Sequence, residues 1–258
     1  VIKSLSDIKA VGHRVVHGAE KFSGSVLITE AVIEALKENI PLAPLHNPPN
    51  ITGIEAMMQA LPGVPNVGVF DTAFHATMPP ESDLYGVPYE WYEKHHVRRY
   101  GFHGTSHRFV SERAADILGI AKDKFNCITC HMGNGSSFTA IEAGKSYDTS
   151  MGMAPLEGIV MGTRSGDIDA GIPKFLADNN NMSFADIDNA LNKKSGLLGL
   201  SGISSDMRDI ESAAKEGHER AKLAVDVLRH RALKYIGAYA IELGRVDAII
   251  FTGGIGEN

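Results

Sequence analysis

Short apolar runs of strand length alternate along this chain with longer segments whose apolar residues recur at helical spacing. The segment from Glu219 to Leu243 has apolar residues three or four positions apart, and the almost wholly apolar run Asp247–Thr252 follows it. Such alternation is typical of an α/β protein with mixed sheets. The sequence therefore predicts an α/β fold, and its 258 residues suffice for one large domain or parts of two.

Start and stop signals for helices lie between these runs. Thr29 can cap a helix with its side-chain oxygen, and Pro48 stands where a first helical turn tolerates proline. A further helix is expected from Ser106 to Gly119, where a glycine can end it.

Two strand-like runs break into glycine-rich turns, HMGNGSS at 131–137 and FTGGIGEN at 251–258. Glycine lets the backbone approach a ligand closely, and turned N–H groups form a nest suited to phosphate. Neither turn matches a P-loop or a dinucleotide-binding motif. Because a tight hairpin needs glycine in any case, each turn alone fits a structural role as well as a functional one.

Unusual polar residues lie beside other turns. Arg14 and Arg164 can each fork onto a carboxylate or phosphoryl oxygen, and Asp71 ends a strand expected at 65–70. His46 and His103 lie in short segments flanked by Gly or Pro. A lone histidine or arginine of this kind is more often structural, so these residues are only candidates at this point.

Two further loop segments are candidates. The stretch from Asp148 to Gly171 is rich in Gly, Ser, Thr and Met, and a loop of such length usually has a function. The SSDMRD segment at 204–209 can equally cap the helix that follows it.

Several classes of site and partner are not expected. Histidines four apart occur at 13–17 and 103–107 without the Glu of a metalloprotease motif. Cys127 and Cys130 lie in a strand, where residues three apart point to opposite faces, so we expect two buried thiols and no zinc or redox pair. The net charge of −6 is spread out, which disfavours nucleic acid and anionic membranes as partners. Without a membrane span or signal peptide in view, a cytoplasmic location is expected.

Taken in order, nine segments of the chain are very similar to the signature of the acetate kinase family. The resemblance runs from about Ile8 to Asn258, with small departures at Ala19, Met132 and Ala154. The segments are GHRVVHG, APLHNP, FDTAFH, YGFHGTSH, HMGNGSS, DTSMGMAPLEG, MGTRSGDID, SGLLGLSGISSDMRD and FTGGIGEN.

The resemblance implies the two-lobed, ribonuclease H-like fold shared by acetate and sugar kinases, heat-shock ATPases and actin. Residues 1–98 would form part of the first lobe, on the acyl and phosphoryl side, and residues 99–258 most of the second, nucleotide-binding lobe. The family's first phosphate hairpin and its magnesium-ligating Glu do not occur in this sequence. The expected fold is therefore incomplete at both ends, and no metal ligand is expected within the chain.

The implied activity is direct, reversible phosphoryl transfer between ATP and acetate, giving acetyl phosphate and ADP with Mg²⁺, in a homodimer. Two alternatives stay open: a propionate kinase, which Val16 mildly disfavours by its size, and a catalytically silent nucleotide-binding fragment. By resemblance the catalytic residues are Arg14, His46, Asp71, His103 and Arg164. The acyl-binding residues are Arg14, Val16, Leu45, Phe102 and Pro155. The nucleotide-binding residues are His131, Met132, Gly133, Asn134, Gly135, Asp206, Met207, Arg208, Gly254, Ile255, Gly256, Glu257 and Asn258.

Overall fold

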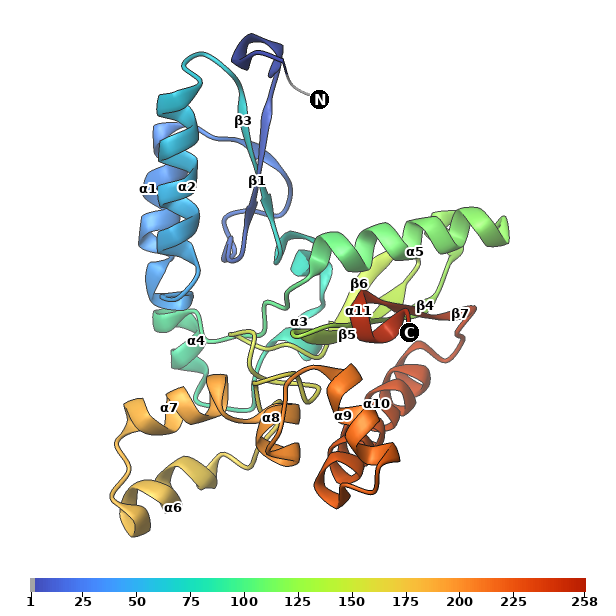
Figure 1. Cartoon of the computed structure of the whole chain (residues 1–258). Helices are drawn as coiled ribbons and strands as arrows, with labels where there is room; N and C mark the ends of the chain where they lie inside the picture. Colours follow the sequence, from blue (N-terminus) through green and yellow to red (C-terminus); the bar gives the residue numbers. More distant parts are fainter. Residues whose placement is uncertain (1–2) are drawn as a thin grey trace.

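The computed structural model describes residues 3–258 and contains two β-sheets in two arms of the molecule. Figure 1 shows the first sheet standing upright beside helices α1 and α2, while the second lies to one side below it, between long helices. The strands of each sheet run in mixed directions. The prediction of an α/β fold with mixed sheets is confirmed.

The first sheet has the strand order β1-β3-β2, with β1 parallel and β2 antiparallel to β3. Its elements are β1 (Val11–Val15), β2 (Val26–Leu27), α1 (Glu30–Glu38), α2 (Asn47–Ala60) and β3 (Asn66–Phe70). The helices and strands bury a shared apolar core that includes Val15, Leu36, Ile54 and Phe70. This core fixes the ends of β1 and β3 beside each other, where Arg14 and Asp71 lie.

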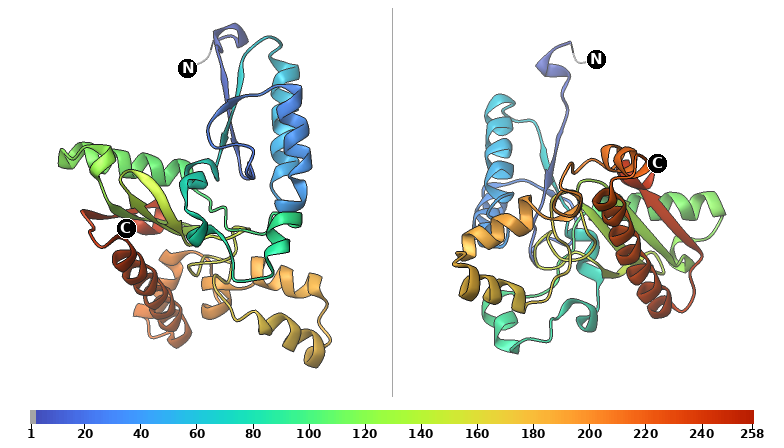
Figure 2. Two further views of the ribbon diagram at one scale, coloured as in Figure 1. Left: turned by 180° about the vertical axis from the view of Figure 1, so that it is seen from behind. Right: turned by 60° about the horizontal axis from the view of Figure 1, so that its bottom comes forward.

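The second sheet has the order β6-β5-β4-β7, with β7 parallel to β4 and the other pairs antiparallel. Its strands are β4 (Cys127–Met132), β5 (Ser136–Glu142), β6 (Lys145–Thr149) and β7 (Ala248–Thr252). Helix α5 (Gly104–Leu118) contacts β4 and β7, and α10 (Glu219–Leu243) contacts β5 and β4. Figure 2 shows these two helices on opposite sides of the sheet.

Shorter elements connect and flank the two sheets. The helices are α3 (Pro80–Asp83), α4 (Tyr89–His95), α6 (Gly171–Asn180), α7 (Phe184–Lys193), α8 (Gly196–Ser201), α9 (Met207–Lys215) and α11 (Gly253–Gly256). Single turns of 3₁₀-helix are η1 (Leu5–Asp7), η2 (Ile40–Leu42), η3 (Ala73–Thr77) and η4 (Lys122–Lys124). The proposed boundary at residue 98 falls in the connection between the sheets and stays a prediction.

The local signals in the sequence are largely confirmed. The Thr29 hydroxyl accepts a hydrogen bond from the backbone N–H of Val32 and caps α1, and Pro48 stands in the first turn of α2. The hairpin β4–β5 turns at 133–135, as expected. One detail differs, because the glycines at 253–256 form the single helical turn α11 instead of an open loop.

Cys127 and Cys130 point to opposite faces of β4, as predicted. Cys127 packs in the cluster with Ala115 of α5, while Cys130 packs in the cluster with Leu228 of α10. Both thiols are free and fully buried. Burial raises the pKa of each thiol to about 12, so both stay protonated at neutral pH.

Within residues 3–258, none of the helices combines the length and the apolar character that crossing a membrane requires.

Candidate active site

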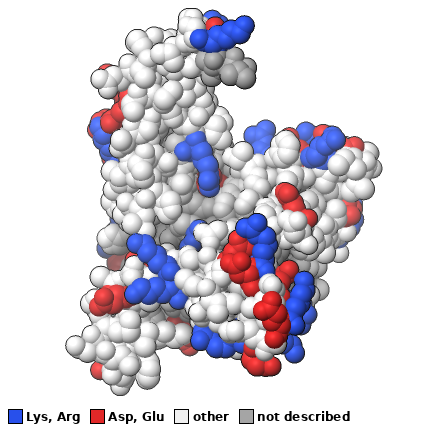
Figure 3. Space-filling view, viewed as in Figure 1, with Lys and Arg blue, Asp and Glu red and all other residues white. Residues whose placement is uncertain are grey.

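The two arms of the molecule enclose a cavity of about 650 Å³, which Figure 3 shows as a hollow in the surface between them. Residues of both arms line it. They are Gly12, His13, Arg14, Val69, Asp71, His103, Thr105, Ser106, Phe109, His131, Gly133, Asn134 and Gly135. Residues that the sequence singles out at 14, 71, 103, 131 and 133–135 are thereby brought together from segments far apart in the chain, while Met132 is buried in the core cluster of the second sheet.

Arg14 and Asp71 lie at the neighbouring ends of the parallel strands β1 and β3. Arg14 Nε and Nη2 donate to Asp71 Oδ1 and Oδ2 at 2.9 and 2.7 Å. The Asp71 side chain is 3% exposed, whereas that of Arg14 is 66% exposed and faces the cavity. The hydrogen bond to Asp71 raises the pKa of the Arg14 guanidinium, which therefore stays charged and faces the cavity in a fixed orientation.

Arg164 reaches the same region from the long loop between β6 and α6. Its Nη1 donates to the backbone carbonyl of Pro155, and burial lowers its pKa, although an arginine stays charged at any ordinary pH. A Cβ atom on Gly135 would lie 2.9 Å from Arg164 Nη2 and 3.4 Å from His103 Nε2. The absence of a side chain at 135 thus allows both groups to approach the hairpin.

His103 is the N-cap of α5 and has left-handed backbone geometry, with φ of 57°. Its ring stacks on that of His131 with centroids 4.2 Å apart, and its Nδ1 lies 2.8 Å from Ser137 Oγ. Burial, together with His131, Arg14 and Arg164, lowers the pKa of His103 to about 2. The imidazole is therefore neutral and can act as a hydrogen-bond donor without carrying charge.

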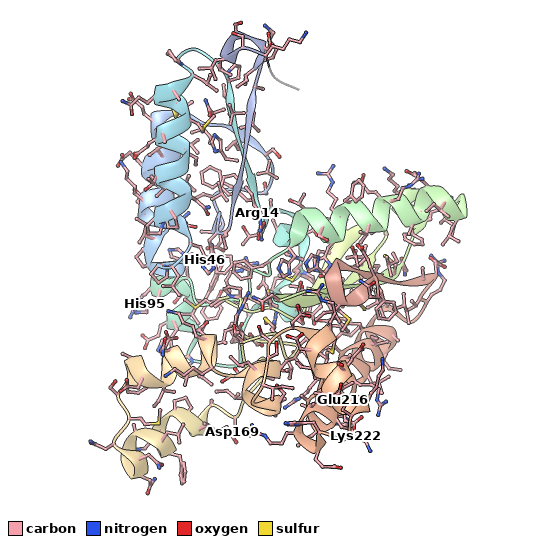
Figure 4. All side chains as sticks on the ribbon, in the orientation of Figure 1. Arg14, His46, His95, Asp169, Glu216 and Lys222 are labelled. Atoms are coloured by element: carbon pink, nitrogen blue, oxygen red, sulfur yellow. The ribbon has the colours of Figure 1, made fainter. Side chains whose placement is uncertain are left out.

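His46 lies at the N-terminus of α2, and Figure 4 shows it on the same inner side of the molecule as Arg14. Burial is the main reason that the pKa of His46 is lowered, and the charges of Arg164 and Arg14 lower it further. His46 is thus within electrostatic reach of both arginines, although neither it nor Arg164 is among the residues that line the main cavity.

The four apolar residues expected around an acyl group are only partly brought together. Val16 packs against Phe102, which is 1% exposed. Pro155 is half-buried and contacts Arg164 through its carbonyl. Leu45, in contrast, is 60% exposed and lies outside the cluster of Val16 and Phe102. Its place in an acyl pocket stays a prediction that no contact supports.

Met151 and Met161 complete the apolar cluster around Phe102, and both are fully buried. Sequence reasoning noted the methionine-rich loop but assigned these two residues no role. No sequence signal distinguishes them, because the burial of a loop methionine depends on how the loop folds back on the rest of the molecule.

The two glycine-rich turns lie side by side, because β4 and β7 are parallel and His131 pairs with Thr252. Gly253 has φ of 83°, and a Cβ there would lie 2.5 Å from the Met132 carbonyl oxygen. Only glycine allows this approach. The turn at 133–135 and the segment that begins at Gly253 are therefore neighbours. None of residues 254–258 lines the main cavity, so their part in nucleotide binding stays a prediction.

The segment at 206–208 has a structural role that the sequence allowed for. Asp206 caps α9 by accepting from the backbone N–H of Arg208, and the two side chains form an ion pair. Met207 packs against the core beneath α10. None of the three lines the main cavity, so their part in nucleotide binding stays a prediction.

Six lining residues were not foreseen as part of a site: Gly12, His13, Val69, Thr105, Ser106 and Phe109. Ser106 Oγ lies 2.8 Å from His131 Nδ1 and so joins α5 to the hairpin. A helical start signal at Ser106 was recognised, but a hydroxyl at a helix start gives no indication of a partner 25 positions away.

Across residues 3–258, no group of three or more His, Cys, Asp or Glu side chains is arranged to hold a metal ion. Asp71 is the one carboxylate among the residues that line the cavity.

Comparison with known proteins identifies the family of the chain. The model of the acetokinase family matches residues 1–258. The acetate kinase of Natranaerobius thermophilus is 62% identical over the whole chain, which covers 65% of that protein. The acetate kinase of Pseudothermotoga lettingae is also 62% identical, with 64% of it covered. The chain thus spans about 65% of the length of these curated relatives.

Solved structures show the same fold. A Porphyromonas gingivalis acetate kinase superposes with a TM-score of 0.96 at 57% identity, covering all of this chain and 64% of that one. A propionate kinase from Francisella tularensis superposes with a TM-score of 0.95 at 52% identity, covering 98% and 65%. Because the family model matches all 258 residues of the chain, and a solved acetate kinase that is 57% identical has the same fold, the chain belongs to the acetokinase family.

Proposed function

We propose that this protein is an acetate kinase, which transfers a phosphoryl group reversibly between ATP and acetate. The observation that carries the proposal is the cavity lined by Arg14, held by Asp71, and by the neutral His103 and a glycine hairpin, with Arg164 beside that hairpin next to His103. Membership of the acetokinase family supports it independently.

The chemistry needs positioning and charge more than a strong base. An oxygen of the acetate carboxylate forms a bond to the γ-phosphorus while the bond from that phosphorus to the β–γ bridging oxygen breaks, and ADP leaves. The equatorial oxygens of the transferring group gain stabilisation from two guanidinium groups and one N–H donor. Because a carboxylate is already a competent nucleophile, no proton has to be removed.

Asp71 is accordingly an orienting group. Both of its oxygens accept hydrogen bonds from Arg14, which leaves it poorly suited to act as a base. We assign it the role of holding the guanidinium in one direction.

The nucleotide would lie along the hairpin at 133–135 and the turn at 254–258, whose backbone N–H groups can bind phosphate oxygens. Mg²⁺ would enter with the nucleotide and neutralise charge on its phosphates. The one carboxylate among the lining residues, Asp71, is buried and accepts from Arg14 with both oxygens, so it does not fit a ligand of this ion.

Acetate is proposed over propionate because the apolar cluster of Val16 and Phe102 is filled by Met151 and Met161. The likeness to a propionate kinase structure keeps the longer acid as the second candidate. One methylene in an apolar pocket changes the activation free energy by about 1–3 kcal/mol, so the two acids are separable by measurement.

The deciding experiment measures ADP formation from ATP with acetate, propionate and butyrate, in a full-length protein and in residues 1–258 alone. The proposal expects the highest kcat/KM with acetate in the full-length protein. ATP binding without turnover in both proteins would favour the silent nucleotide-binding protein instead. A homodimer and a cytoplasmic location are further parts of the proposal, and sedimentation and cell fractionation test them.

A further inference from the structure

A row of buried hydrogen bonds runs from β4 through α5 and β5 to the edge of the cavity. Thr129 Oγ1 lies 2.7 Å from His107 Nδ1, and His107 Nε2 lies 2.7 Å from Ser137 Oγ. Ser137 Oγ in turn lies 2.8 Å from His103 Nδ1. Thr129, His107 and Ser137 are all 0% exposed. Each of these groups therefore depends on its neighbours in the row for hydrogen bonds.

Both histidines of this row are neutral. Burial and the nearby His75, His103 and His131 lower the pKa of His107 well below its ordinary value, and burial likewise lowers that of His103. A neutral imidazole has one N–H donor and one nitrogen that only accepts. A hydroxyl has a single hydrogen to donate. If Ser137 Oγ accepted from both histidines, its own hydroxyl hydrogen would be buried without an acceptor, because these two bonds are the only ones it makes within residues 3–258. Two arrangements of hydrogens therefore remain, one for each direction.

Thr129 decides between the two directions. In the described part of the chain its hydroxyl has one hydrogen-bond partner, His107 Nδ1. If His107 Nδ1 carried a hydrogen, the hydroxyl hydrogen of Thr129 would be buried without an acceptor, which is costly. Thr129 therefore donates to Nδ1, and the hydrogen of His107 lies on Nε2.

The remaining bonds follow in order. His107 Nε2–H donates to Ser137 Oγ, and the Ser137 hydroxyl then donates to His103 Nδ1, the one acceptor that the described residues offer it. With Nδ1 accepting, the hydrogen of the neutral His103 must be on Nε2. This nitrogen has no hydrogen-bond partner within residues 3–258 and lies beside Gly135 and Arg164 Nη2.

We propose that Thr129, His107 and Ser137 are positioning residues, which fix His103 in the tautomer whose Nε2–H points into the cavity toward the transferring phosphoryl group. The identity of the acceptor, a phosphoryl oxygen, rests on the proposed function. The direction of the hydrogen bonds from Thr129 to His103 does not depend on it. In the opposite tautomer Nε2 would present a lone pair to an anionic oxygen, and the donor that the transition state needs would be lost.

The test is ¹⁵N NMR of the full-length protein labelled at histidine, because a protonated ring nitrogen and an unprotonated one have well-separated chemical shifts. We expect the wild-type protein to show His103 protonated at Nε2. Thr129→Val removes the hydroxyl at nearly constant volume, and we expect His103 then to populate both tautomers. The matched control is Thr139→Val, since Thr139 is also 0% exposed but its hydroxyl pairs with Thr149, outside the row.

Kinetics give the second readout. Thr129→Val should lower kcat by about tenfold, comparable to the loss of one buried hydrogen bond, with KM for acetate changed by less than about twofold. Thr129→Ser restores the hydroxyl and should recover both the tautomer and the rate. If Thr129→Val is unstable, Ser137→Ala serves instead. Its control is Ser146→Ala, because Ser146 is also buried but its hydroxyl pairs with His75, outside the row.

Two results would overturn the proposal: a wild-type His103 protonated at Nδ1, or unchanged His103 nitrogen shifts in both Thr129→Val and Ser137→Ala. A protein that shows the expected tautomers but turns over no carboxylate would contradict the proposed function and still support the directed row.

Discussion

Arg14 and Asp71 form a two-bond fork across the ends of neighbouring parallel strands, with the carboxylate buried and the guanidinium facing the cavity. The register of β1 and β3 pairs Val15 with Phe70, so each partner of the fork is adjacent to a paired core residue. The direction of the Arg14 guanidinium is thus determined by the packing of a sheet.

Replacing Asp71 tests this relationship. Asp71→Asn should lower kcat/KM by roughly 30-fold, equivalent to about 2 kcal/mol, because Arg14 loses charge-assisted hydrogen bonds that orient it. Asp178→Asn, which removes an exposed carboxylate paired with Lys174, is the control and should leave kinetics unchanged. A normal kcat/KM in Asp71→Asn would show that the fork does not position Arg14.

The two arginines should be indispensable. Arg14→Ala and Arg164→Ala should each raise the activation free energy by about 3–5 kcal/mol, because both charges act on the transferring group in the transition state. Lysine at either position should recover little, since it lacks the planar fork. Arg229→Ala, on the exposed face of α10, is the control. Near-normal kinetics in one variant would remove that arginine from the site.

Val16 should set the size of the acyl group. Because Val16 packs against Phe102, Val16→Ala should make room for one methylene and raise the kcat/KM of propionate relative to acetate by roughly tenfold. The wild-type order should be acetate, then propionate, then butyrate. Unchanged ratios in Val16→Ala would mean that Val16 does not line the acyl site, and a wild-type preference for propionate would identify a propionate kinase.

Buried histidines should make stability depend on pH. Burial lowers the pKa of His17 and His75 to about 4, from an ordinary value of 6.5. Between those values the unfolded chain binds protons that the folded protein does not, so the free energy of unfolding rises with pH and is lost as pH falls from 6.5 toward 4. Each such group changes it by about 1.4 kcal/mol per pH unit in that window.

Urea denaturation at several pH values measures this dependence. His75→Gln should reduce the slope by one proton, while a glutamine amide can still donate to the Phe102 carbonyl as His75 does. His95→Gln, at an exposed position near the end of α4, is the control. An identical slope in wild type and His75→Gln would contradict the burial of a neutral His75.

Turnover should require Mg²⁺, because the phosphate charge of the nucleotide must be neutralised during transfer. Excess chelator should abolish ADP formation, and added Mg²⁺ should restore it. A full rate in chelator would refute a metal-assisted reaction.

The parts of the fold that depend on neighbouring residues were predictable from the sequence. Thr29 and Pro48 mark helix starts because capping acts within one turn, and the glycines at 133 and 135 mark a hairpin because the chain must reverse there. The α/β class followed from the alternation of strand and helix signals. Arg14, Asp71 and His103 were candidates from their places beside turns, but only the resemblance of whole segments assigned them to one site.

The row from Thr129 to His103 could not be predicted in the same way. Its members come from β4, α5 and β5, and a threonine or serine within a strand reads as an ordinary sheet residue. Their pairing depends on how α5 lies on the sheet, which only tertiary packing decides. The exposure of Leu45 could not be predicted for the same reason. Its segment matches the family as a unit, but the direction of one side chain within it depends on tertiary packing.

The two cysteines on opposite faces of β4 give the protein separate internal reporters of its opening. With pKa values near 12, neither thiol reacts appreciably while it is covered, so a thiol reagent modifies it only after a helix leaves the sheet. Cys127 lies under α5 and Cys130 under α10. The modification rate of each cysteine therefore reports how often one particular helix separates from the sheet. The ratio of the two rates shows whether α5 and α10 separate together or independently.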